Sequence, residues 1–579
     1  MVVDTNAEVM FEGTGAEILV ESLCHAGIGM IFGVPGDTGI IFYDALYHRR
    51  DRLRHVLARD ERHAAIMADV YARCTNTVGV VEASSGGGVT YLASGLGEPY
   101  ASSVPMLVIT SDIHRRSRSS GAITEIDQRL LFAAVTKWLT TVEDAADIPR
   151  LVAEALMAAT SGRPGPVCLV VPEDVFDQHR QVTITPMANI TPYARVAADA
   201  QAIHQAADAL RHAERPAIVS GGGIHLSGAW KELGEMAASF GIPVATTIHG
   251  KGTFAETSPW SLGVVGANGA RAYANEYVAS ADVVLFIGTR ANSSDTNGYT
   301  SPPLAGATII HNDIDLGRAG RNYPGSIALV GDARATLQQL IAALSPGDAG
   351  RRDHLRSWIA NQCQGWHLES LQSVILDGGL LNPRDVVRTI HDVVDAETLV
   401  LGDAGTPTPN LASYWEVATA ARSIMLPRGH GSMGWAIPGA IGAAFAHPGR
   451  PVIALTTDGS LAMACGELET ACRFQLPIVF VQFTNGSLGW IKMLQHLYLD
   501  RRYFGVEPGT IDAVAVARGM GLQAARVSTI EEFARIFREG LAERRPMYID
   551  VPVPEFMDLV PPVASWQATL AGTGGRPVY

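Results

Sequence analysis

The sequence lacks the features of a membrane protein, a secreted protein or a nucleic-acid-binding protein. No apolar run approaches the ~20 residues of a membrane-spanning helix. The acidic N-terminal segment has no basic stretch followed by an apolar one, so we expect no signal peptide and a cytoplasmic protein. The chain has 44 Lys and Arg residues against 58 Asp and Glu residues, a formal charge of −14, and no basic block. We therefore expect a small-molecule substrate, and neither a nucleic acid nor a membrane as partner.

Paired or clustered cysteines are also missing. The six cysteines show neither CxxC spacing nor the mixed Cys/His spacing of a zinc site: Cys24, Cys74, Cys168, Cys363, Cys465 and Cys472. We interpret them as reduced thiols, as in proteins of the cytosol. The sequence does have 47% apolar and only 18% charged residues, which is typical of a compact globular protein. Its 579 residues are enough for several domains.

Three regions of the chain alternate apolar strands with amphipathic helices. That alternation is typical of parallel α/β sheets, in which ligands bind at the carboxyl ends of the strands. We predict three doubly wound parallel-sheet domains of the α/β class at 1–185, 196–345 and 380–560, and a C-terminal tail at 561–579 that could act as a lid. The first and third regions close with similar segments, GPVCLVVPEDV and RPMYIDVPVPE, which suggests that they share a fold.

A possible metal site lies in the stretch TTDGSLAMACGELETACRFQLPIVFVQFTNGSLGW, which predicts a strand, a helix, a strand and a polar turn. Asp458 follows the first strand and Asn485 follows the second. The Asp458 carboxylate, the Asn485 amide oxygen and the backbone carbonyl of Ser487 are ligands that suit Mg²⁺, together with two phosphate oxygens. The backbone N–H groups of Gly459 and Ser460 open the helix and can meet phosphate oxygens. Asp, Asn and Gly are also ordinary turn residues, and the βαβ spacing is what favours a metal site.

The same stretch resembles the GDG…NN thiamine-diphosphate motif of the acetolactate synthase and pyruvate oxidase family, with Thr457 for the first Gly and Thr484 for the first Asn. The resemblance runs from IFGVPGD to PMYIDVP in the family's own order of segments. It implies a pyrimidine-binding domain, a central domain and a diphosphate-binding domain. It also implies thiamine diphosphate and Mg²⁺ as cofactors, and a homodimer or homotetramer with active sites between subunits.

The resemblance also implies roles for residues that would contact the pyrimidine half of the cofactor. Glu61 in ARDERHAAIMADVYAR looks like the family glutamate that hydrogen-bonds the aminopyrimidine and promotes proton exchange at C2. A carboxyl group in an apolar cleft has the raised pKa that such exchange needs, although a helix N-terminus also favours Glu. RGHGSMGWAIPGAIGAA resembles the segment in which Met433 supports the bent cofactor and the carbonyls of Gly431 and Met433 hold the pyrimidine. His430 replaces an apolar residue, and both a catalytic and a structural role remain open.

Other cofactor contacts follow from the same comparison of motifs. Gly405 and Thr406 in DAGTPTP stand in place of a Gly-Gln-His phosphate clamp, whereas Pro407 has no N–H to donate. Arg163 in SGRPGP matches the family. The central domain has segments that look like those that touch FAD in acetolactate synthase, with Gly222, Gly223, Arg290 and Asp313. A Gly-rich turn is weak evidence for a nucleotide, and Asn268 replaces a His of the synthases, so FAD, the ADP portion of coenzyme A and no ligand all remain open.

The substrate pocket departs from that of the synthases. Thr124 takes the place of an active-site Gln and is a candidate catalytic residue, and Glu173 takes the place of an entrance Lys, which reverses the charge that meets a 2-oxo acid. Trp490 and Lys492 replace apolar residues beside the substrate.

We expect an enzyme that cleaves a C–C bond next to a carbonyl and passes the fragment to a second acceptor, in an acetolactate-synthase-like carboligation of a 2-oxo acid. One alternative, favoured by His430 and Glu173, is a non-decarboxylating lyase or hydrolase that acts on a 2-hydroxyacyl-CoA or a 1,2-dione. The other is an inactive homologue that binds the cofactor. Glu61, Asp458 and Asn485 argue against this last alternative, because the expected machinery is present.

Overall fold

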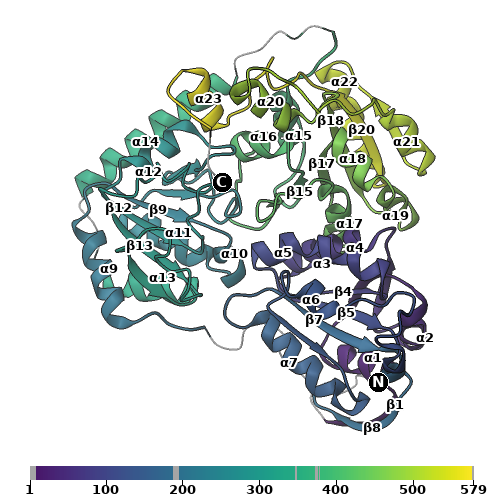
Figure 1. Ribbon diagram of the computed structural model, residues 1–579. Coiled ribbons are helices and arrows are strands. Elements are labelled where there is room, and N and C mark those ends of the chain that lie inside the picture. Colours follow the sequence, from purple (N-terminus) through teal and green to yellow (C-terminus); the bar gives the residue numbers. More distant parts are fainter. Residues whose placement is uncertain (1–7, 187–194, 346–348, 372–375, 377, 577–579) are drawn as a thin grey trace. The chain divides into compact units, whose positions relative to one another are not determined.

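The computed structural model describes residues 8–186, 195–345, 349–371, 376 and 378–576. Residues 187–194 of the predicted linker and residues 577–579 of the predicted tail lie outside this part. Three six-stranded parallel sheets and one antiparallel pair of strands make up the β structure of the described residues (Figure 1). The prediction of three parallel-sheet α/β regions is therefore confirmed.

The chain forms two compact units. Unit 1 contains the described residues of Met1–Ala194, Pro427–Gly449 and Ala464–Leu476. Unit 2 contains those of Arg195–Leu426, Arg450–Met463 and Pro477–Tyr579. Two segments of the predicted third region thus belong to unit 1, and the domain boundaries expected from the sequence stay predictions.

Unit 1 is built on one parallel sheet. Its strands are β2 (Met30–Val34), β3 (Arg54–Leu57), β4 (Gly79–Ala83), β5 (Met106–Asp112), β6 (Trp138–Thr141) and β7 (Pro166–Pro172), in the order β3-β2-β4-β5-β7-β6. The antiparallel pair is β1 (Val9–Thr14) and β8 (His179–Ile184). The α-helices are α1 (Gly15–His25), α2 (Ile40–His48), α3 (Glu61–Thr75), α4 (Gly87–Gly95), α5 (Gly97–Ser102), α6 (Gln128–Phe132), α7 (Ile148–Thr160), α8 (Glu173–Phe176), α17 (Ala436–Ala446) and α19 (Glu467–Arg473). Three short 3₁₀ turns are η1 (Asp37–Gly39), η2 (Arg115–Ser117) and η3 (Ala145–Asp147).

Helices α3 and α17 pack closely although they are far apart in the sequence. The small residues of α17 allow this contact, because a methyl group at Gly442 would lie 2.2 Å from the Met67 carbonyl oxygen. At the start of α17, the Trp435 indole N–H donates to the buried Asp69 carboxylate at 3.1 Å, and Asp69 also pairs with Arg73 at 2.8 Å. The helix that begins at Glu61 is thus fixed by residues from the predicted third region.

Unit 2 contains the two other sheets. The central strands are β9 (Pro216–Ser220), β10 (Val244–Thr246), β11 (Ser261–Val264), β12 (Val283–Ile287), β13 (Thr308–Asp313) and β14 (Ile327–Val330), in the order β11-β10-β9-β12-β13-β14. The third sheet has β15 (Leu399–Gly402), β16 (Ile424–Met425), β17 (Val452–Thr457), β18 (Ile478–Thr484), β19 (Gln523–Arg526) and β20 (Met547–Pro552), in the order β16-β15-β17-β18-β20-β19.

Helices surround both sheets of unit 2. With the central sheet go α9 (Ala200–His212), α10 (Gly223–Ser227), α11 (Trp230–Phe240), α12 (Ala272–Ala279), α13 (Ala333–Ala343) and α14 (Ala349–Ser370). With the third sheet go α15 (Pro383–Val393), α16 (Pro407–Tyr414), α18 (Asp458–Ala464), α20 (Gly489–Tyr498), α21 (Ala513–Gly519), α22 (Ile530–Glu543) and α23 (Ala564–Leu570). Figure 1 shows α9, α11 and α13 on one side of the central sheet, with α12 and α14 on the other. No helix of the described residues combines the length and apolar character of a membrane span.

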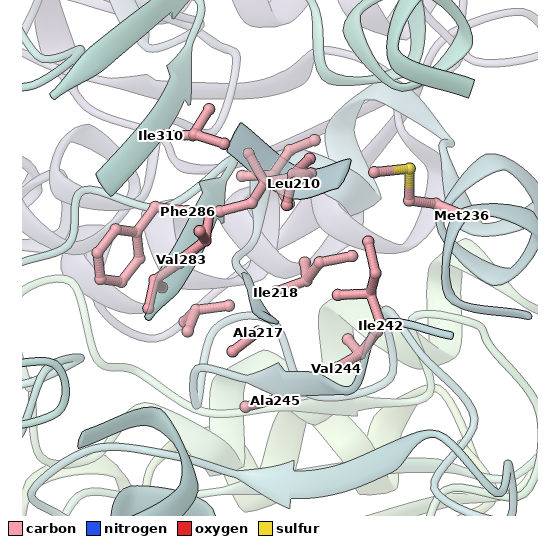
Figure 2. Packing of buried hydrophobic residues seen from close by; sticks show 14 of the residues in the cluster. Leu210, Ala217, Ile218, Met236, Ile242, Val244, Ala245, Val283, Phe286 and Ile310 are labelled. Carbon is pink, nitrogen blue, oxygen red and sulfur yellow. The ribbon is translucent and has the colours of Figure 1, made fainter. Parts of the chain in front are cut away.

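The core of the central region shows why continuous apolar runs become buried parallel strands. Strands covered by helices on both faces need apolar side chains at every position. Figure 2 shows buried side chains from α9, α11 and the strands in one cluster, among them Leu210, Ala217, Ile218, Met236, Ile242, Val244, Val283, Phe286 and Ile310.

The strand orders locate the edges where ligands can bind. The sheet of unit 1 and the third sheet have the same strand order. In both, the second strand along the chain lies on one side of the first strand, and the later strands lie on its other side. This agreement supports the predicted likeness of the first and third regions. The order in which the chain adds strands to the sheet reverses between β2 and β4, between β9 and β12, and between β15 and β17. In open α/β sheets, such switch points form the crevices that bind ligands.

Candidate active site

Asp458 and Asn485 lie at the same edge of the third sheet. Strands β17 and β18 pair in parallel, so the residues after both strands emerge together at the carboxyl edge. The Asp458 carboxylate accepts backbone hydrogen bonds from Gly459 and Gly486, each at 2.8 Å, and from Asn485 at 3.3 Å. One strand end is therefore bonded directly to the turn that follows its neighbour.

The turn after β18 contains further polar groups suited to a cation. Asn485 Oδ1 accepts the N–H of Ser487 at 3.2 Å. Ser487 is buried, and its hydroxyl oxygen has no hydrogen-bond partner within the described part of the chain. Burial raises the pKa of the Asp458 carboxyl group, while its three N–H bonds act in the opposite direction. A divalent cation would favour the charged carboxylate, so these residues fit Mg²⁺.

The metal expected here differs from a metal held by protein side chains alone. Among the described residues, no group of three or more His, Cys, Asp or Glu side chains could hold a metal ion. Mg²⁺ does not need such a group, because it is commonly bound by one or two carboxylates plus phosphate oxygens and water. The single carboxylate of Asp458 suits that arrangement.

The two N–H groups expected to meet phosphate already have acceptors within the chain. Gly459 N–H donates to Asp458, and Ser460 N–H donates to the Thr457 hydroxyl at 3.2 Å. On the adjacent strand, Gly405 has a φ of 107°, and a methyl group there would lie 3.6 Å from the Thr457 side chain. Gly405 therefore lies across the switch point from the strand that leads to Asp458.

Thr406 immediately precedes α16. It is buried, its carbonyl accepts from the Asn410 amide at 2.9 Å, and Pro407 occupies the first helical position. Proline suits that position, because its missing N–H would have no partner inside the helix. Phosphate contacts by Gly405, Thr406, Gly459 and Ser460 stay predictions.

Glu61 is the first residue of α3 in unit 1. Asp60 caps this helix by accepting the Arg62 N–H at 2.8 Å. Burial raises the pKa of the half-buried Glu61 carboxyl group, with smaller contributions in the same direction from Asp60 and Glu82. A methyl group at Gly88 would lie 3.0 Å from Glu61 Oε1, so glycine leaves room for the carboxyl group. The raised pKa agrees with what proton exchange needs, and the role of Glu61 stays a prediction.

A buried carboxylate that the sequence analysis missed anchors the start of this helix. Glu467 of α19 accepts the Arg59 N–H at 2.9 Å and lies 3.2 Å from His63 Nδ1. It is fully buried and also accepts from the Thr470 hydroxyl. Because Arg59 and His63 flank Glu61, these contacts fix the position from which its side chain projects.

A second missed carboxylate, Glu98, organises the loop that contains His430. Glu98 is 1% exposed and accepts the backbone N–H groups of Gly429, His430 and Gly431 at 3.0, 2.6 and 3.2 Å. Arg73 contacts the same carboxylate at 3.4 Å. The only sequence signal was an acidic residue within the otherwise apolar and small segment SGLGEPYA. The structure therefore joins the predicted residues His430 and Gly431 to α5.

Other predicted residues lie elsewhere in unit 1. Met433 is half-buried beyond the same loop. Thr124 is exposed, has a φ of 68° and accepts a hydrogen bond from Ser85 at 2.9 Å. Arg163 precedes β7, at the amino edge of the sheet, and donates to the Tyr100 carbonyl at 2.6 Å and to Ser103 at 2.9 Å. Arg163 is thus placed at the edge opposite to Glu61, and its contact with a cofactor stays a prediction.

The central sheet brings Gly222 and Gly223 to its switch point. Gly223 N–H donates to the Gly288 carbonyl at 2.8 Å, and a methyl group at Gly223 would lie 2.6 Å from Gly288 Cα. The glycines thus have a packing role where two strand ends meet. Arg290 follows β12 on the other side of the crevice, and Asp313 ends β13, where burial raises its carboxyl pKa. The sheet has the 3-2-1-4-5-6 order of dinucleotide-binding folds.

The predicted tail contains α23, whose Trp566 is fully buried. Its ring centroid lies 4.4 Å from that of Trp490 and 5.6 Å from that of Phe556. Beside this cluster, Lys492 pairs with Glu555 at 2.7 Å and with Glu507 at 3.0 Å. The tail is therefore anchored at Trp566, and movement as a lid stays a prediction.

Comparisons with known proteins agree with these observations. Thiamine pyrophosphate enzyme family models match all three regions: the N-terminal TPP binding domain at residues 13–131, the central domain at 203–340 and the C-terminal TPP binding domain at 403–551. The chain is 33% identical to a probable acetolactate synthase large subunit of Methanocaldococcus jannaschii, over 95% of this chain and 93% of the relative. It is 33% identical to an acetolactate synthase of Arthrospira platensis, over 95% and 96%. It is 30% identical to the acetolactate synthase isozyme 3 large subunit of Escherichia coli, over 93% and 95%.

Proposed function

Because this chain belongs to the thiamine pyrophosphate enzyme family that includes the acetolactate synthase large subunits, we propose that it joins a fragment of a 2-oxo acid to a second carbonyl compound. The chain is a thiamine-diphosphate-dependent enzyme of the carboligase and decarboxylase type. The single observation that carries the proposal is the strand-end carboxylate of Asp458, bonded to three backbone N–H groups at the switch-point edge of the third sheet. The relatives do not favour a non-decarboxylating lyase or hydrolase, or an inactive homologue.

The proposed cofactor contacts fall into two sets of residues. Asp458, Asn485 and Ser487 would hold Mg²⁺ with the diphosphate, and Gly405, Thr406, Gly459 and Ser460 would contact the diphosphate itself. Glu61, Gly431 and Met433 would contact the pyrimidine. The buried carboxylate turn and the raised pKa of Glu61 support this assignment. When bound, thiamine diphosphate supplies the electron sink for breaking a C–C bond next to a carbonyl.

The chain's own residues have separate tasks in this proposal. Burial raises the pKa of the Glu61 carboxyl group, so it keeps its proton to a higher pH than an exposed glutamate does and can serve in proton exchange. Glu467 and Glu98 act as positioning residues, since they fix the start of α3 and the 429–431 loop. His430 and Thr124 are candidate substrate contacts.

We propose FAD as the ligand of the central domain, in contact with Gly222, Gly223, Arg290 and Asp313. We propose Arg163, which precedes β7 in unit 1, as a further cofactor-binding residue. The strand order and the switch-point position of the glycines support a dinucleotide. Visible absorbance of the purified protein tests this proposal. A protein that gives no flavin spectrum after incubation with FAD would contradict it.

We also propose a cytoplasmic homodimer or homotetramer with active sites shared between subunits. Large apolar side chains are exposed near the carboxyl edge of the unit 1 sheet, among them Ile40 at 65%, Tyr91 at 60% and Ile123 at 89%. Such side chains are favourable in an interface. Light scattering after size exclusion would give the oligomeric state, and a monomer would contradict the proposal.

The function is tested by proton NMR of the protein with thiamine diphosphate, Mg²⁺, FAD and pyruvate. We expect loss of pyruvate and the appearance of acetolactate, and no reaction when thiamine diphosphate is left out. Untouched pyruvate with the cofactor bound would contradict carboligation of this 2-oxo acid.

A further inference from the structure

Five hydroxyl groups form a connected cluster in unit 1, which we call the hydroxyl cluster: Thr38, Ser84, Ser85, Ser111 and Thr124. Thr38 Oγ1 lies at its centre, 2.8 Å from Ser84 Oγ, 3.0 Å from Ser85 Oγ and 2.7 Å from Ser111 Oγ. The Ser85 hydroxyl donates to Thr124 Oγ1 at 2.9 Å. The cluster lies where strands of the unit 1 sheet end, and ligands of open α/β sheets bind outside such carboxyl ends.

The hydroxyl cluster lies at the switch point of the unit 1 sheet. Thr38 follows β2, Ser84 and Ser85 follow β4, and Ser111 lies near the end of β5. These strands are neighbours, and the order in which the chain adds strands to the sheet reverses between β2 and β4. Glu61 reaches the same edge, since its carboxyl group approaches Gly88 in the helix that follows Ser85. The hydroxyl cluster and Glu61 therefore lie at the same edge of the sheet.

Thr124 is held in an unusual conformation. Its φ of 68° is in the left-handed region, which β-branched residues rarely adopt and which persists only where the surroundings hold it. Neighbouring residues hold Thr124 in this conformation. Glu125 accepts the N–H groups of Gly121 and Ala122 at 3.0 and 3.1 Å, and a side chain at Gly86 would lie 2.6 Å from Thr124 Cβ.

The Ser85 hydroxyl links the cluster to Thr124. Ser85 uses its proton on Thr124, so its contact with Thr38 requires Thr38 to donate to Ser85. The Ser85 N–H also donates to Thr38 Oγ1 at 3.3 Å, and the Ser111 hydroxyl donates to Ser84 Oγ at 3.4 Å. At the end of this chain, Thr124 accepts from Ser85 and keeps its own proton for an outside acceptor. Hydroxyl chains polarise one another, which strengthens the last donor.

The hydroxyl cluster offers a neutral donor to a ligand. Within the described residues, no lysine or arginine side chain hydrogen-bonds to any of the five hydroxyl groups. A neutral oxygen of a bound acceptor would gain a hydrogen bond from Thr124, because the Thr124 hydroxyl keeps its own proton.

We propose that the hydroxyl cluster favours, through Thr124, aldehyde acceptors that carry an uncharged oxygen on the carbon next to the reacting carbonyl, such as an α-hydroxyaldehyde, over aldehydes that lack this oxygen. This assignment rests on the proposed carboligation and names the class of its second substrate. Loss of one neutral hydrogen bond typically changes such a preference about 5-fold. Thr38, Ser85 and Ser111 are positioning residues in this scheme, because they orient the Thr124 hydroxyl.

The test uses two aldehydes of equal size, glycolaldehyde and propanal, with pyruvate as donor and the complete enzyme. The measured quantity is the ratio of kcat/KM for glycolaldehyde to kcat/KM for propanal. We expect Thr124→Val to lower this ratio about 5-fold and Thr38→Val to lower it by a smaller factor. Thr77→Val removes an exposed hydroxyl before β4, at the amino edge, and should leave the ratio unchanged. Comparing variants removes the intrinsic reactivity difference between the aldehydes.

The outcomes separate this inference from the proposed function. Ratios within twofold of the wild type in Thr124→Val would overturn the role of the hydroxyl cluster while leaving carboligation intact. Thr124 is exposed, so this variant should fold even if Thr38→Val, at the centre of the cluster, does not. Wild-type protein with bound thiamine diphosphate that forms no product from pyruvate and either aldehyde would overturn both proposals.

Discussion

The carboxylate of Glu98 accepts the backbone N–H of His430 at 2.6 Å, with 1% of Glu98 exposed. The same carboxylate binds the N–H groups on either side of His430 and contacts Arg73. Buried charges are retained when they are paired and hydrogen-bonded, and here the charge holds a loop of consecutive N–H groups. The position of the 429–431 loop therefore depends on a side chain from a distant part of the sequence.

Replacing Glu98 should loosen this loop. We expect Glu98→Gln to lower the free energy of unfolding by about 3 kcal/mol, because it leaves the buried Arg73 with Asp69 as its remaining carboxylate. Thiamine diphosphate should also bind more weakly, since Gly431 is a proposed contact. Urea unfolding and cofactor titration measure both effects. Glu154→Gln, from an exposed pair with Arg150, should change the free energy of unfolding by less than ~0.5 kcal/mol. If Glu98→Gln and Glu154→Gln changed it equally, the role of Glu98 in holding the loop would be contradicted.

Glu61→Gln tests the proton-holding role directly. The amide has nearly the same shape as the carboxyl group, so the variant should retain bound thiamine diphosphate. It should lose most of the hydrogen–deuterium exchange at C2 of the cofactor, measured by NMR. Glu531→Gln, in the first turn of α22, controls for the loss of any helix N-terminal glutamate. Unchanged exchange in Glu61→Gln would remove Glu61 from the mechanism.

The raised pKa of Glu61 gives a second expectation, for the protein without cofactor. A carboxyl group whose pKa is higher in the folded state contributes stability at low pH, and that contribution is lost as pH rises through the folded-state pKa. The Glu61→Gln variant has no carboxyl group at this position, so it does not lose this stability as pH rises. Its unfolding free energy should therefore rise relative to the wild type from pH 4 to pH 7, in urea titrations at each pH. A difference that shrinks over that range would mean that the folded-state pKa is lowered.

Asp458 and Asn485 should control metal-dependent cofactor binding. Loss of an outer-shell partner costs ~10–100-fold in metal affinity, and we expect Asp458→Ala and Asn485→Ala to cost at least as much. Titration of thiamine diphosphate at fixed Mg²⁺, followed by protein fluorescence, measures this loss, and a chelator should mimic it in the wild type. Asp500→Asn, on an exposed carboxylate of the same unit, should bind normally. Normal binding by both alanine variants would refute the proposed metal site.

The sequence was sufficient for local structure and insufficient for long-range buried charges. Runs such as PIVFVQFT and PVIALTT predicted strands, and the residues after them predicted the edge where Asp458 meets Asn485. Glu467 and Glu98 could not be found this way, because their partners are backbone N–H groups from segments hundreds of residues away. The Gly459 N–H group was expected to be open to phosphate, but it is bonded to the preceding carboxylate. A pattern shows which groups lie at an edge, whereas the packing decides which of them already have partners.

A buried cluster of three charges in unit 2 gives the strongest stability prediction. Glu256 pairs with Lys251 at 2.5 Å and with Arg271 at 2.6 Å, and all three side chains are at most 7% exposed. Lys251 also donates to the Ala412 carbonyl at 3.1 Å, which ties the central region to α16 and so to the segment after Thr406. Glu256→Gln removes the carboxylate that both buried cations contact and should lower the free energy of unfolding by ~3–5 kcal/mol.

The control for this prediction is a replacement of the whole cluster. Apolar side chains of similar volume need no countercharge, so the triple variant Lys251→Met, Glu256→Leu and Arg271→Met should be more stable than Glu256→Gln alone. Glu539→Gln, from an exposed pair with Arg535, should change stability by less than ~0.5 kcal/mol. Urea unfolding of the three variants measures the difference. If the triple variant were the least stable, the hydrogen bond to Ala412 and the shape of the cluster, rather than its charge balance, would hold α16 in place.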